Sequence, residues 1–347
     1  HTRSLCDWSS DVCSSDLTGA SESANGIAHT SDGGYATVGA IMPVGSASRD
    51  ILVIKYDPAG NIQWAIRYGG TGNDVGYSIE QTPDKGFIIG AETDSVSPTL
   101  NLALVKLDAA GNVQWSWVYE GDTSAEDMVH TTNAGVAVAI APASNVAGLN
   151  ITPGYALTGR KRVSQTNQRA VLVRTTATGA PIFNFGYDDN AYLTRTRMTF
   201  SDVVFDADGS LVVVGTDTDV VNGSRPDPTV IRFNPAGLSI FSNVYPSTLV
   251  TANALCKSGG YGLTLTSTRD IVFNGPNDMT VGAQNLQTVR LTPAGAPVWN
   301  SMLGQAGPGY RSIHMDPAGN IAQSRSEEHT SELQSHSDLV CRLLLEK

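Results

Sequence analysis

The chain has 347 residues, of which 41% are hydrophobic and 16% are charged, and its formal net charge at pH 7 is −11. An acidic chain without a concentration of lysine or arginine suits nucleic acid poorly, so we expect no nucleic-acid partner. No apolar run approaches the ~20 residues that a membrane-spanning helix needs, so we expect no membrane span.

The two ends of the chain differ from the rest. Residues 6–17 and 325–347 read as in-frame translations of one stretch of sequencing-adaptor DNA, taken from opposite strands. We therefore expect residues 1–17 and 325–347 to be adaptor-derived and not native, and we exclude them from the fold. The alternative for the C-terminal segment is a helical tail, because its apolar residues have rough helical spacing. Without these ends Cys256 is the one remaining cysteine, which excludes a disulfide framework or a cysteine-based metal site.

Between these ends, one set of residue types recurs five times. A glycine marks each copy, and consecutive glycines lie 51 to 68 residues apart. A basic residue stands five positions before each glycine, a large aromatic residue stands four positions after it, and in the first four copies a tyrosine stands eight after it. The glycines are Gly60, Gly111, Gly179, Gly237 and Gly295, and the aromatic residues are Trp64, Trp115, Phe183, Phe241 and Trp299. Matching offsets in five copies identify a repeat protein.

The predicted elements of each copy are short strands. In the first copy, Leu52–Tyr56 is rich in residues that favour strands, and Asp57-Pro-Ala-Gly60 has the composition of a tight turn closed by a left-handed glycine. The second copy adds an earlier pair of strands, Val75–Gln81 and Phe87–Gly90, before its own strand at Ala103–Leu107. The same order returns along the chain, and residues 310–323 begin a sixth copy.

Four strands in ~50–60 residues, with no amphipathic helix, are typical of one blade of a β-propeller. We therefore predict an all-β fold, a β-propeller of four-stranded antiparallel blades over residues 18–324. It holds five complete blades and part of a sixth, and so forms an incomplete ring. The third and fifth copies match the pattern least well, because residues 134–153 carry an insertion and residues 253–278 fit poorly.

The first two copies also resemble a known family. Gly69-Gly-Thr-Gly-Asn-Asp74, Asp84-Lys-Gly-Phe-Ile-Ile-Gly90 and Gly111-Asn-Val-Gln-Trp115 resemble the bacterial β-propeller repeats of the delta-60 and SBBP type. The resemblance weakens in the later copies, and in the third and fourth the tryptophan becomes phenylalanine. It implies a secreted or cell-surface bacterial protein in which the propeller is a binding or display module, and it implies no defined activity.

Two recurring sets are candidate sites. The aromatic residues after each glycine can form a carbohydrate-stacking surface or pack between neighbouring blades, and we favour packing. The basic residue before each glycine can surround an anionic ligand or pair within its own blade, and we favour pairing.

A third set consists of the acidic residues that open the inner strands, which are Asp74, Glu126, Asp127, Asp188 and Asp189. Inner strands line the channel of a propeller, so these carboxylates can converge at its rim and bind a ligand or a cation. The alternative is that each carboxylate caps its own glycine-rich loop by accepting backbone N–H bonds. We expect no other cofactor or metal. Asp206-Ala-Asp-Gly209 reads as a hairpin turn, because the further ligands of a calcium loop are missing.

The loops between the second and third strands are long and variable, whereas the hairpin turns are short and uniform. In a propeller these long loops emerge at the same end as the loops that join blades. Variable loops on a rigid scaffold are where binding tends to reside, so we expect this end to bind an unknown protein or glycan ligand.

No catalytic residue is assigned, because none of the common hydrolase, metalloprotease or phosphate-binding motifs occurs in the sequence. The leading interpretation is a non-enzymatic extracellular or cell-surface scaffold for binding or display. One alternative is a quinoprotein-like dehydrogenase, since Leu107–Trp115 is similar to the tryptophan-containing blade motif of that family. That family commonly uses a vicinal cysteine pair, whereas Cys256 is the one cysteine outside the adaptor-derived ends. A polysaccharide-active enzyme is the other alternative, and it needs two carboxylates ~5–10 Å apart.

Overall fold

The computed structural model of the chain describes residues 21–96, 101–119, 136–142, 151–162, 168–187, 195–219, 226–245, 262–280, 283–306, 313–315 and 321–323. The predicted adaptor-derived segments, 1–17 and 325–347, lie outside these residues. The chain separates into two compact units, residues 1–188 and residues 189–347. No helix long and apolar enough to cross a membrane occurs in the part of the chain that the structure describes.

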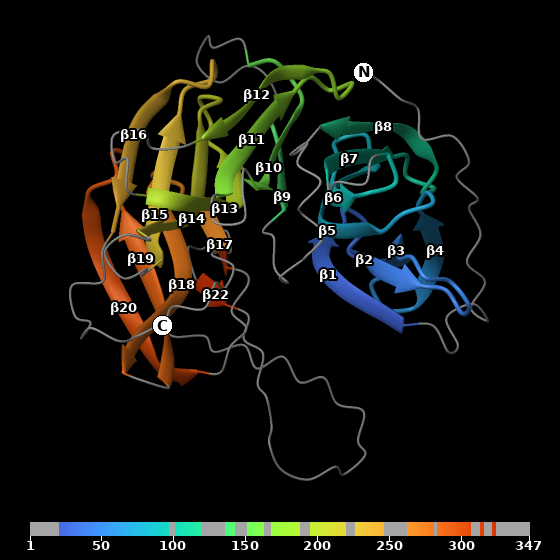
Figure 1. Cartoon of the computed structure of the whole chain (residues 1–347), viewed down its shortest axis with the longest axis horizontal. Coiled ribbons are helices and arrows are strands. Elements are labelled where there is room, and N and C mark those ends of the chain that lie inside the picture. Colours follow the sequence, from blue (N-terminus) through green and yellow to red (C-terminus); the bar gives the residue numbers. More distant parts are fainter. Residues whose placement is uncertain are drawn as a thin grey trace. The chain divides into compact units, whose positions relative to one another are not determined.

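The first unit contains three antiparallel four-stranded blades (Figure 1). Blade 1 consists of β1 (Ser21–His29), β2 (Tyr35–Met42), β3 (Asp50–Tyr56) and β4 (Ile62–Tyr68). Blade 2 consists of β5 (Asp74–Gln81), β6 (Phe87–Thr93), β7 (Asn101–Leu107) and β8 (Val113–Tyr119). Blade 3 consists of β9 (Ala137–Ile140), β10 (Tyr155–Arg162), β11 (Gln168–Thr175) and β12 (Pro181–Tyr187).

The second unit repeats this plan. Blade 4 consists of β13 (Arg195–Phe205), β14 (Leu211–Asp219), β15 (Pro226–Phe233) and β16 (Ser239–Val244). Blade 5 consists of β17 (Gly262–Leu265), β18 (Ile271–Thr280), β19 (Ala283–Leu291) and β20 (Pro297–Ala306). β21 (Ile313–Met315) and β22 (Ile321–Gln323) form a further antiparallel pair. The predicted all-β fold of five complete blades and part of a sixth is confirmed.

The repeated glycine closes the turn between the third and fourth strands of each blade. In blade 1 the Gly60 N–H donates to the Asp57 carbonyl at 3.0 Å, and Gly60 has a φ of +86°. The other four repeat glycines also have positive φ, between +81° and +88°. Glycine adopts this conformation without the steric cost that a Cβ atom brings. The tight turn closed by a left-handed glycine, predicted from the sequence, is therefore confirmed.

The repeated aromatic residue and the same glycine meet at the seam between consecutive blades. A Cβ atom on Gly111 of blade 2 would lie 3.3 Å from the Trp64 ring of blade 1. On Gly179 it would lie 2.8 Å from Trp115, and on Gly295 2.8 Å from Phe241. The turn of one blade thus lies against the outer strand of the blade before it. Each of these seams needs a residue without a side chain.

The repeated tyrosine fastens two of these seams. Tyr119 Oη donates to the Gly179 carbonyl at 2.8 Å, and Tyr245 Oη donates to the Gly295 carbonyl at 2.7 Å. Apolar clusters fill the space between blades: one joins blades 1 and 2, one joins blades 2 and 3, and one joins blades 4 and 5. The repeat therefore encodes the contacts between blades, because each blade buries its faces on its neighbours.

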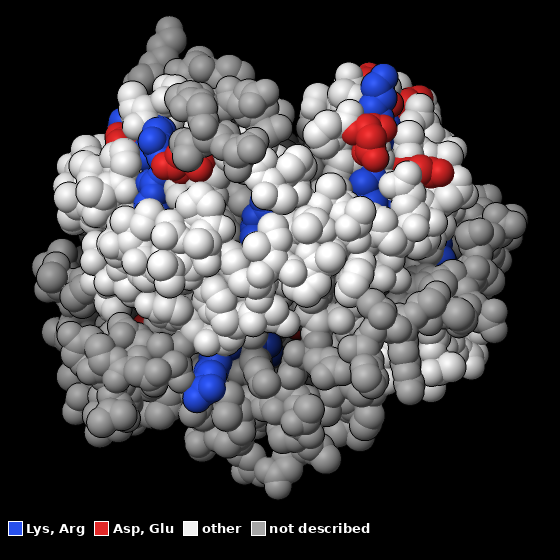
Figure 2. All heavy atoms as spheres, turned by 90° about the horizontal axis from the view of Figure 1, so that it is seen from above, with Lys and Arg blue, Asp and Glu red and all other residues white. Residues whose placement is uncertain are grey.

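The repeated basic residue ties together the two turns at the same end of its blade. Lys55 Nζ donates to Asp32 Oδ2 at 2.9 Å and to the Tyr56 carbonyl at 2.8 Å. Lys106 repeats this with Asp84 at 2.9 Å. On the face that Figure 2 shows, some basic atoms lie beside acidic atoms and others lie apart from them, with broad uncharged areas between. Lys55 and Lys106 are thus paired within the fold at this turn end.

Candidate functional site

The opposite end of each blade carries the long loops, and in the first unit four polar side chains there are close enough to influence one another electrostatically. They are Arg49 before β3, Tyr77 on β5, Glu92 on β6 and Arg160 on β10, here named the Tyr77 group. Arg49 comes from blade 1, Tyr77 and Glu92 from blade 2, and Arg160 from blade 3. Three consecutive blades thus contribute to one cluster.

A β-bulge presents Tyr77. The pairing of β5 with β6 shifts between Gly76 and Ser78, which leaves Tyr77 as the extra residue on the inner strand. Bulges re-aim a side chain, and they are frequent next to functional sites. Glu92 lies on the neighbouring strand, paired with Val75 on one side and with Leu102 on the other.

Burial controls the chemistry of Glu92. Its side chain is 7% exposed, and it accepts a hydrogen bond from the Tyr77 hydroxyl. Burial raises the pKa of Glu92 to about 7, and the charge of Arg160 and the Tyr77 hydrogen bond oppose the rise. The pKa of Tyr77 is also raised, first by burial and then by the charge of Glu92. Glu92 is thus a carboxyl group that exchanges a proton near neutral pH.

Exposure increases outward through the Tyr77 group. Glu92 is buried, Tyr77 and Arg160 are half-buried, and Arg49 is exposed. The backbone of Arg49 is held in place, because its carbonyl accepts the Asp74 N–H at 2.7 Å and its own N–H donates to Asn73 Oδ1 at 3.2 Å. Arg49, Tyr77 and Arg160 thus keep some exposed surface, whereas Glu92 has almost none.

The Tyr77 group does not belong to the repeat. The strand pairings place Ala40, Arg160, Thr216 and Pro276 at the position that Glu92 has in blade 2. The bulge position of Tyr77 is held by Asn25 in blade 1 and by Ser201 in blade 4. The residues that build seams and turns recur from blade to blade, whereas these do not. The residue types of the Tyr77 group are therefore not set by the repeat.

Sequence reasoning missed this group, although one signal was present. The run Phe87-Ile-Ile-Gly-Ala-Glu-Thr93 is apolar up to Glu92, and β6 is buried along its whole length. An acidic residue inside a buried strand is expensive unless it is paired or neutral, so its presence is itself a functional signal. The bulge that brings Tyr77 to it depends on strand register, which the repeat pattern does not give.

The carboxylate of Asp74 is bound to the glycine-rich loop next to the Tyr77 group. Asp74 is 1% exposed, and its Oδ2 accepts hydrogen bonds from the Gly70 N–H at 2.7 Å and from Ser95 Oγ at 2.8 Å. Asp74 thus caps its glycine-rich loop, which is the alternative to a ligand site that the sequence left open for this residue. The other four carboxylates of the predicted rim set, Glu126, Asp127, Asp188 and Asp189, lie outside the described residues. The channel-rim site therefore stays a prediction.

A metal centre has no donor set among the residues that the structure describes. None of them form a group of three or more histidine, cysteine, aspartate or glutamate side chains that could hold an ion. The cation predicted at the channel rim depends on carboxylates that are not described, so it is untested.

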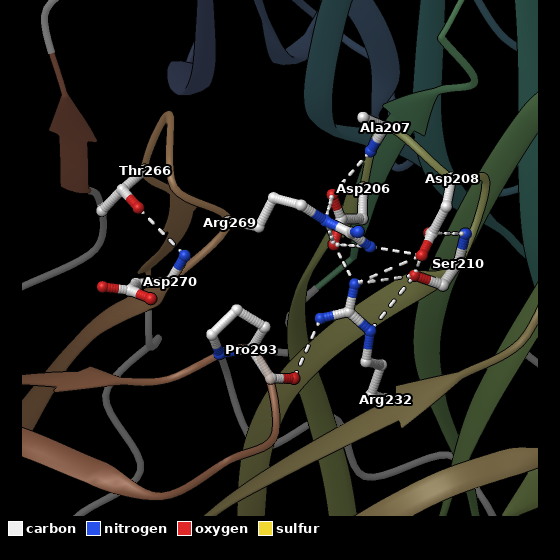
Figure 3. Close-up of polar contacts among 9 residues, drawn as sticks. All are labelled: Asp206, Ala207, Asp208, Ser210, Arg232, Thr266, Arg269, Asp270 and Pro293. Carbon is white, nitrogen blue, oxygen red and sulfur yellow. Dashed lines mark hydrogen bonds and ion pairs between the residues drawn. The ribbon is translucent and has the colours of Figure 1, made fainter. Parts of the chain in front are cut away.

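The Asp206–Gly209 segment forms a hairpin turn between β13 and β14. The Gly209 N–H donates to the Asp206 carbonyl at 2.9 Å, and the Asp206 N–H donates to the Ser210 carbonyl at 2.8 Å. The buried Asp206 carboxylate pairs with Arg232 of its own blade and with Arg269 of blade 5 (Figure 3). Arg232 also donates to the Pro293 carbonyl at 3.1 Å. This network joins blades 4 and 5.

A second buried carboxyl in this unit also serves a seam. Asp202 Oδ2 accepts the Leu263 N–H of blade 5 at 2.8 Å, and burial raises the pKa of Asp202 to about 7. Ser78 holds the equivalent position in blade 2, where its Oγ accepts the Val138 N–H of blade 3 at 3.3 Å. The role of Asp202 recurs between blades, so we assign it to the fold and not to a site.

No protein-family model and no curated protein matches the sequence of this chain. The resemblance to delta-60 and SBBP repeats thus stays a prediction. Solved structures are similar in fold. An ulvan lyase, described as a new family of polysaccharide lyase, is 8% identical with a TM-score of 0.50, over 86% of this chain and 76% of its own. This likeness shows the β-propeller fold and nothing finer.

Two further similar structures have TM-scores below 0.5. The polysaccharide lyase Uly1 is 10% identical with a TM-score of 0.45, over 90% of this chain and 81% of its own. A glucose dehydrogenase is 11% identical with a TM-score of 0.46, over 89% of this chain and 96% of its own. Neither likeness carries an argument about function.

Proposed function

We propose that this β-propeller binds a polysaccharide at the long-loop end of blades 1 to 3, with the Tyr77 group at the centre of the site. The observation that carries the proposal is the electrostatic coupling of Arg49, Tyr77, Glu92 and Arg160 from three blades, with residue types that do not recur at these positions.

The residue types of the Tyr77 group suit a sugar chain. An aromatic ring with a hydroxyl group offers an apolar face for a sugar ring and a polar edge for its hydroxyls. Arginine donates several hydrogen bonds in a fixed geometry, which suits hydroxyl groups and the carboxylates of acidic sugars. A few convergent polar groups that fix orientation are typical of ligand sites. Such a ligand would also suit the extracellular or cell-surface location expected from the family resemblance.

A second candidate is an enzyme that acts on the same polysaccharide by acid–base chemistry. The observation that favours it is Glu92, a carboxyl group whose pKa of about 7 matches that of a general acid or base working near neutral pH. The similar solved structures, several of them enzymes, give no support to the expectation of a non-enzymatic scaffold. The dehydrogenase alternative has no observation of its own in the described residues.

A carbohydrate array followed by titration calorimetry tests the proposal. We expect the protein to bind one or more polysaccharides, and we expect Tyr77→Ala and Arg160→Gln each to weaken binding about tenfold or more, a loss of about 1.4 kcal/mol. Tyr35→Phe, at an exposed tyrosine on β2, is the matched control and should leave the affinity unchanged.

The same polysaccharide then separates binding from catalysis. Chain shortening that disappears in Glu92→Gln, while binding is retained, would identify the acid–base enzyme. If the wild-type protein leaves the polysaccharide intact, the site has the binding role and not the enzymatic one. An array without any hit, or hits that Tyr77→Ala and Arg160→Gln do not weaken, would contradict the proposed site.

A further inference from the structure

Arg49 is the exposed member of the Tyr77 group, and its side chain takes no part in an ion pair with any residue that the structure describes. Its charge opposes the rise that burial causes in the pKa of Tyr77, so the two side chains interact electrostatically. A single exposed arginine is common on protein surfaces and indicates nothing by itself. The partners of the neighbouring carboxylates and the hydrogen bonds of its backbone distinguish Arg49 from such a residue.

The carboxylates next to Arg49 are all bound to other groups. Asp50, the following residue, pairs with Arg67 at 3.3 Å. Asp74 caps its glycine-rich loop, and Asp94 accepts hydrogen bonds from the loop that joins blades 1 and 2. None of these three carboxylates neutralises Arg49 by direct pairing. The guanidinium of Arg49 therefore keeps its hydrogen-bond donors for water or for a ligand.

The backbone of Arg49 is held by the loop that joins blades 1 and 2. Its N–H donates to Asn73 Oδ1 at 3.2 Å, and its carbonyl accepts the Asp74 N–H at 2.7 Å. Asn73 is itself fixed, because its N–H and its side-chain amide both donate to the Asp94 carboxylate. Gly72 permits this contact, since a Cβ atom there would overlap Asp94 Oδ1. An exposed and unpaired arginine thus starts from a fixed backbone.

We propose that the polysaccharide bound at the Tyr77 group is acidic, that its carboxylate or sulfate pairs with Arg49, and that Asn73 positions Arg49 for this contact. The inference rests on the proposed function, because it names the class of polysaccharide that the same site takes. Arginine binds such anionic groups through two parallel N–H···O bonds. A backbone that is already fixed lowers the conformational entropy that binding costs, which raises affinity.

Pairs of polymers that differ in charge test the class of ligand. Titration calorimetry compares polygalacturonate, alginate and hyaluronate with their carboxyl-reduced forms, and dextran sulfate with dextran. We expect an acidic polymer to bind and its neutral counterpart to bind about tenfold or more weakly. The pair that responds shows whether the group is a carboxylate or a sulfate.

Two charge-removing variants place the contact at Arg49. Arg49→Gln should weaken binding of the acidic polymer about tenfold and leave binding of its neutral counterpart unchanged. Lys85→Gln is the matched control, because it removes one positive charge from an exposed residue in the turn at the other end of blade 2. This control should bind both polymers as the wild type does.

The positioning role of Asn73 is measured with and without the Arg49 side chain. Asn73→Ala should weaken binding of the acidic polymer about threefold or more in the wild type and have no further effect in Arg49→Gln, because both changes remove one interaction. A loss of equal size in both backgrounds would show that Asn73 serves only the fold and would overturn this role.

The outcomes separate the inference from the function on which it rests. Equal binding of charged and neutral polymers, binding of neutral polysaccharides alone, or an Arg49→Gln variant that binds as the wild type does would overturn the inference and leave the proposed function intact. Absence of binding to any polysaccharide, charged or neutral, would overturn the proposed function and the inference with it.

Discussion

At the scale of single residues, the ionisation of Glu92 couples the Tyr77 group to the stability of the fold. Burial raises its pKa from the ordinary 4.5 to about 7, so the folded protein holds this proton more tightly than the unfolded chain does. The contribution of Glu92 to the free energy of unfolding is therefore largest below pH 4.5, and it is lost as the pH rises through 7.

Glu92→Gln should remove this part of the pH dependence, because the amide stays neutral. In urea unfolding at pH 5 and pH 8, we expect the wild type to lose about 2–3 kcal/mol more than the variant between the two conditions. Glu22→Gln, on the exposed part of β1, is the control and should follow the wild type. Parallel pH profiles for Glu92→Gln and the wild type would show that Glu92 is not the buried carboxyl described here.

At the scale of elements, the turn between the third and fourth strands fixes the backbone conformation and also packs against the preceding blade. Two glycines separate these two roles. Gly60 and Gly179 have nearly the same φ, +86° and +85°. A Cβ atom on Gly179 would lie against Trp115 and Trp117, whereas a Cβ atom on Gly60 would meet nothing within 4 Å. Both glycines have the same turn conformation, but of these two only Gly179 packs against the preceding blade.

Alanine at these two positions therefore separates backbone strain from seam packing. Gly60→Ala should cost about 1 kcal/mol, the strain of a left-handed alanine. Gly179→Ala should cost about 1–3 kcal/mol more, because the outer strand of blade 2 must also move. Chemical unfolding of both variants provides the measurement. Equal losses would mean that the seam does not need the glycine.

The strands and their turns could be predicted because the same residue types recur at fixed offsets in each copy of the repeat. The offsets of Gly111, Trp115 and Tyr119 are the spacing of a turn, a seam ring and a seam hydroxyl, and such local geometry is written in sequence spacing. The bulge at Tyr77 and the meeting of Glu92 with Arg160 were not predicted. The bulge recurs at Asn25 and Ser201, but no residue type recurs with it, and the meeting of Glu92 with Arg160 depends on the approach of two blades.

At the scale of the whole molecule, the two ends of each blade differ in kind. The turn end is occupied by recurring ion pairs such as Lys55 with Asp32 and Lys106 with Asp84, which hold the blade together. The long-loop end of the first unit carries the non-recurring Tyr77 group. A repeat protein can vary its loops without disturbing its seams, so the proposed binding site and the contacts that hold the blades together lie at different ends.

The proposed function requires that a polysaccharide binds at the long-loop end of the blades and not at their turn end. Peptide-resolved hydrogen exchange, with and without a bound polysaccharide, tests it most directly. We expect slower exchange in residues 74–77, 91–93 and 159–161, with unchanged exchange in the turn residues 30–34 and 82–86. Protection confined to the turns, or to the outer strands β4 and β8, would contradict it.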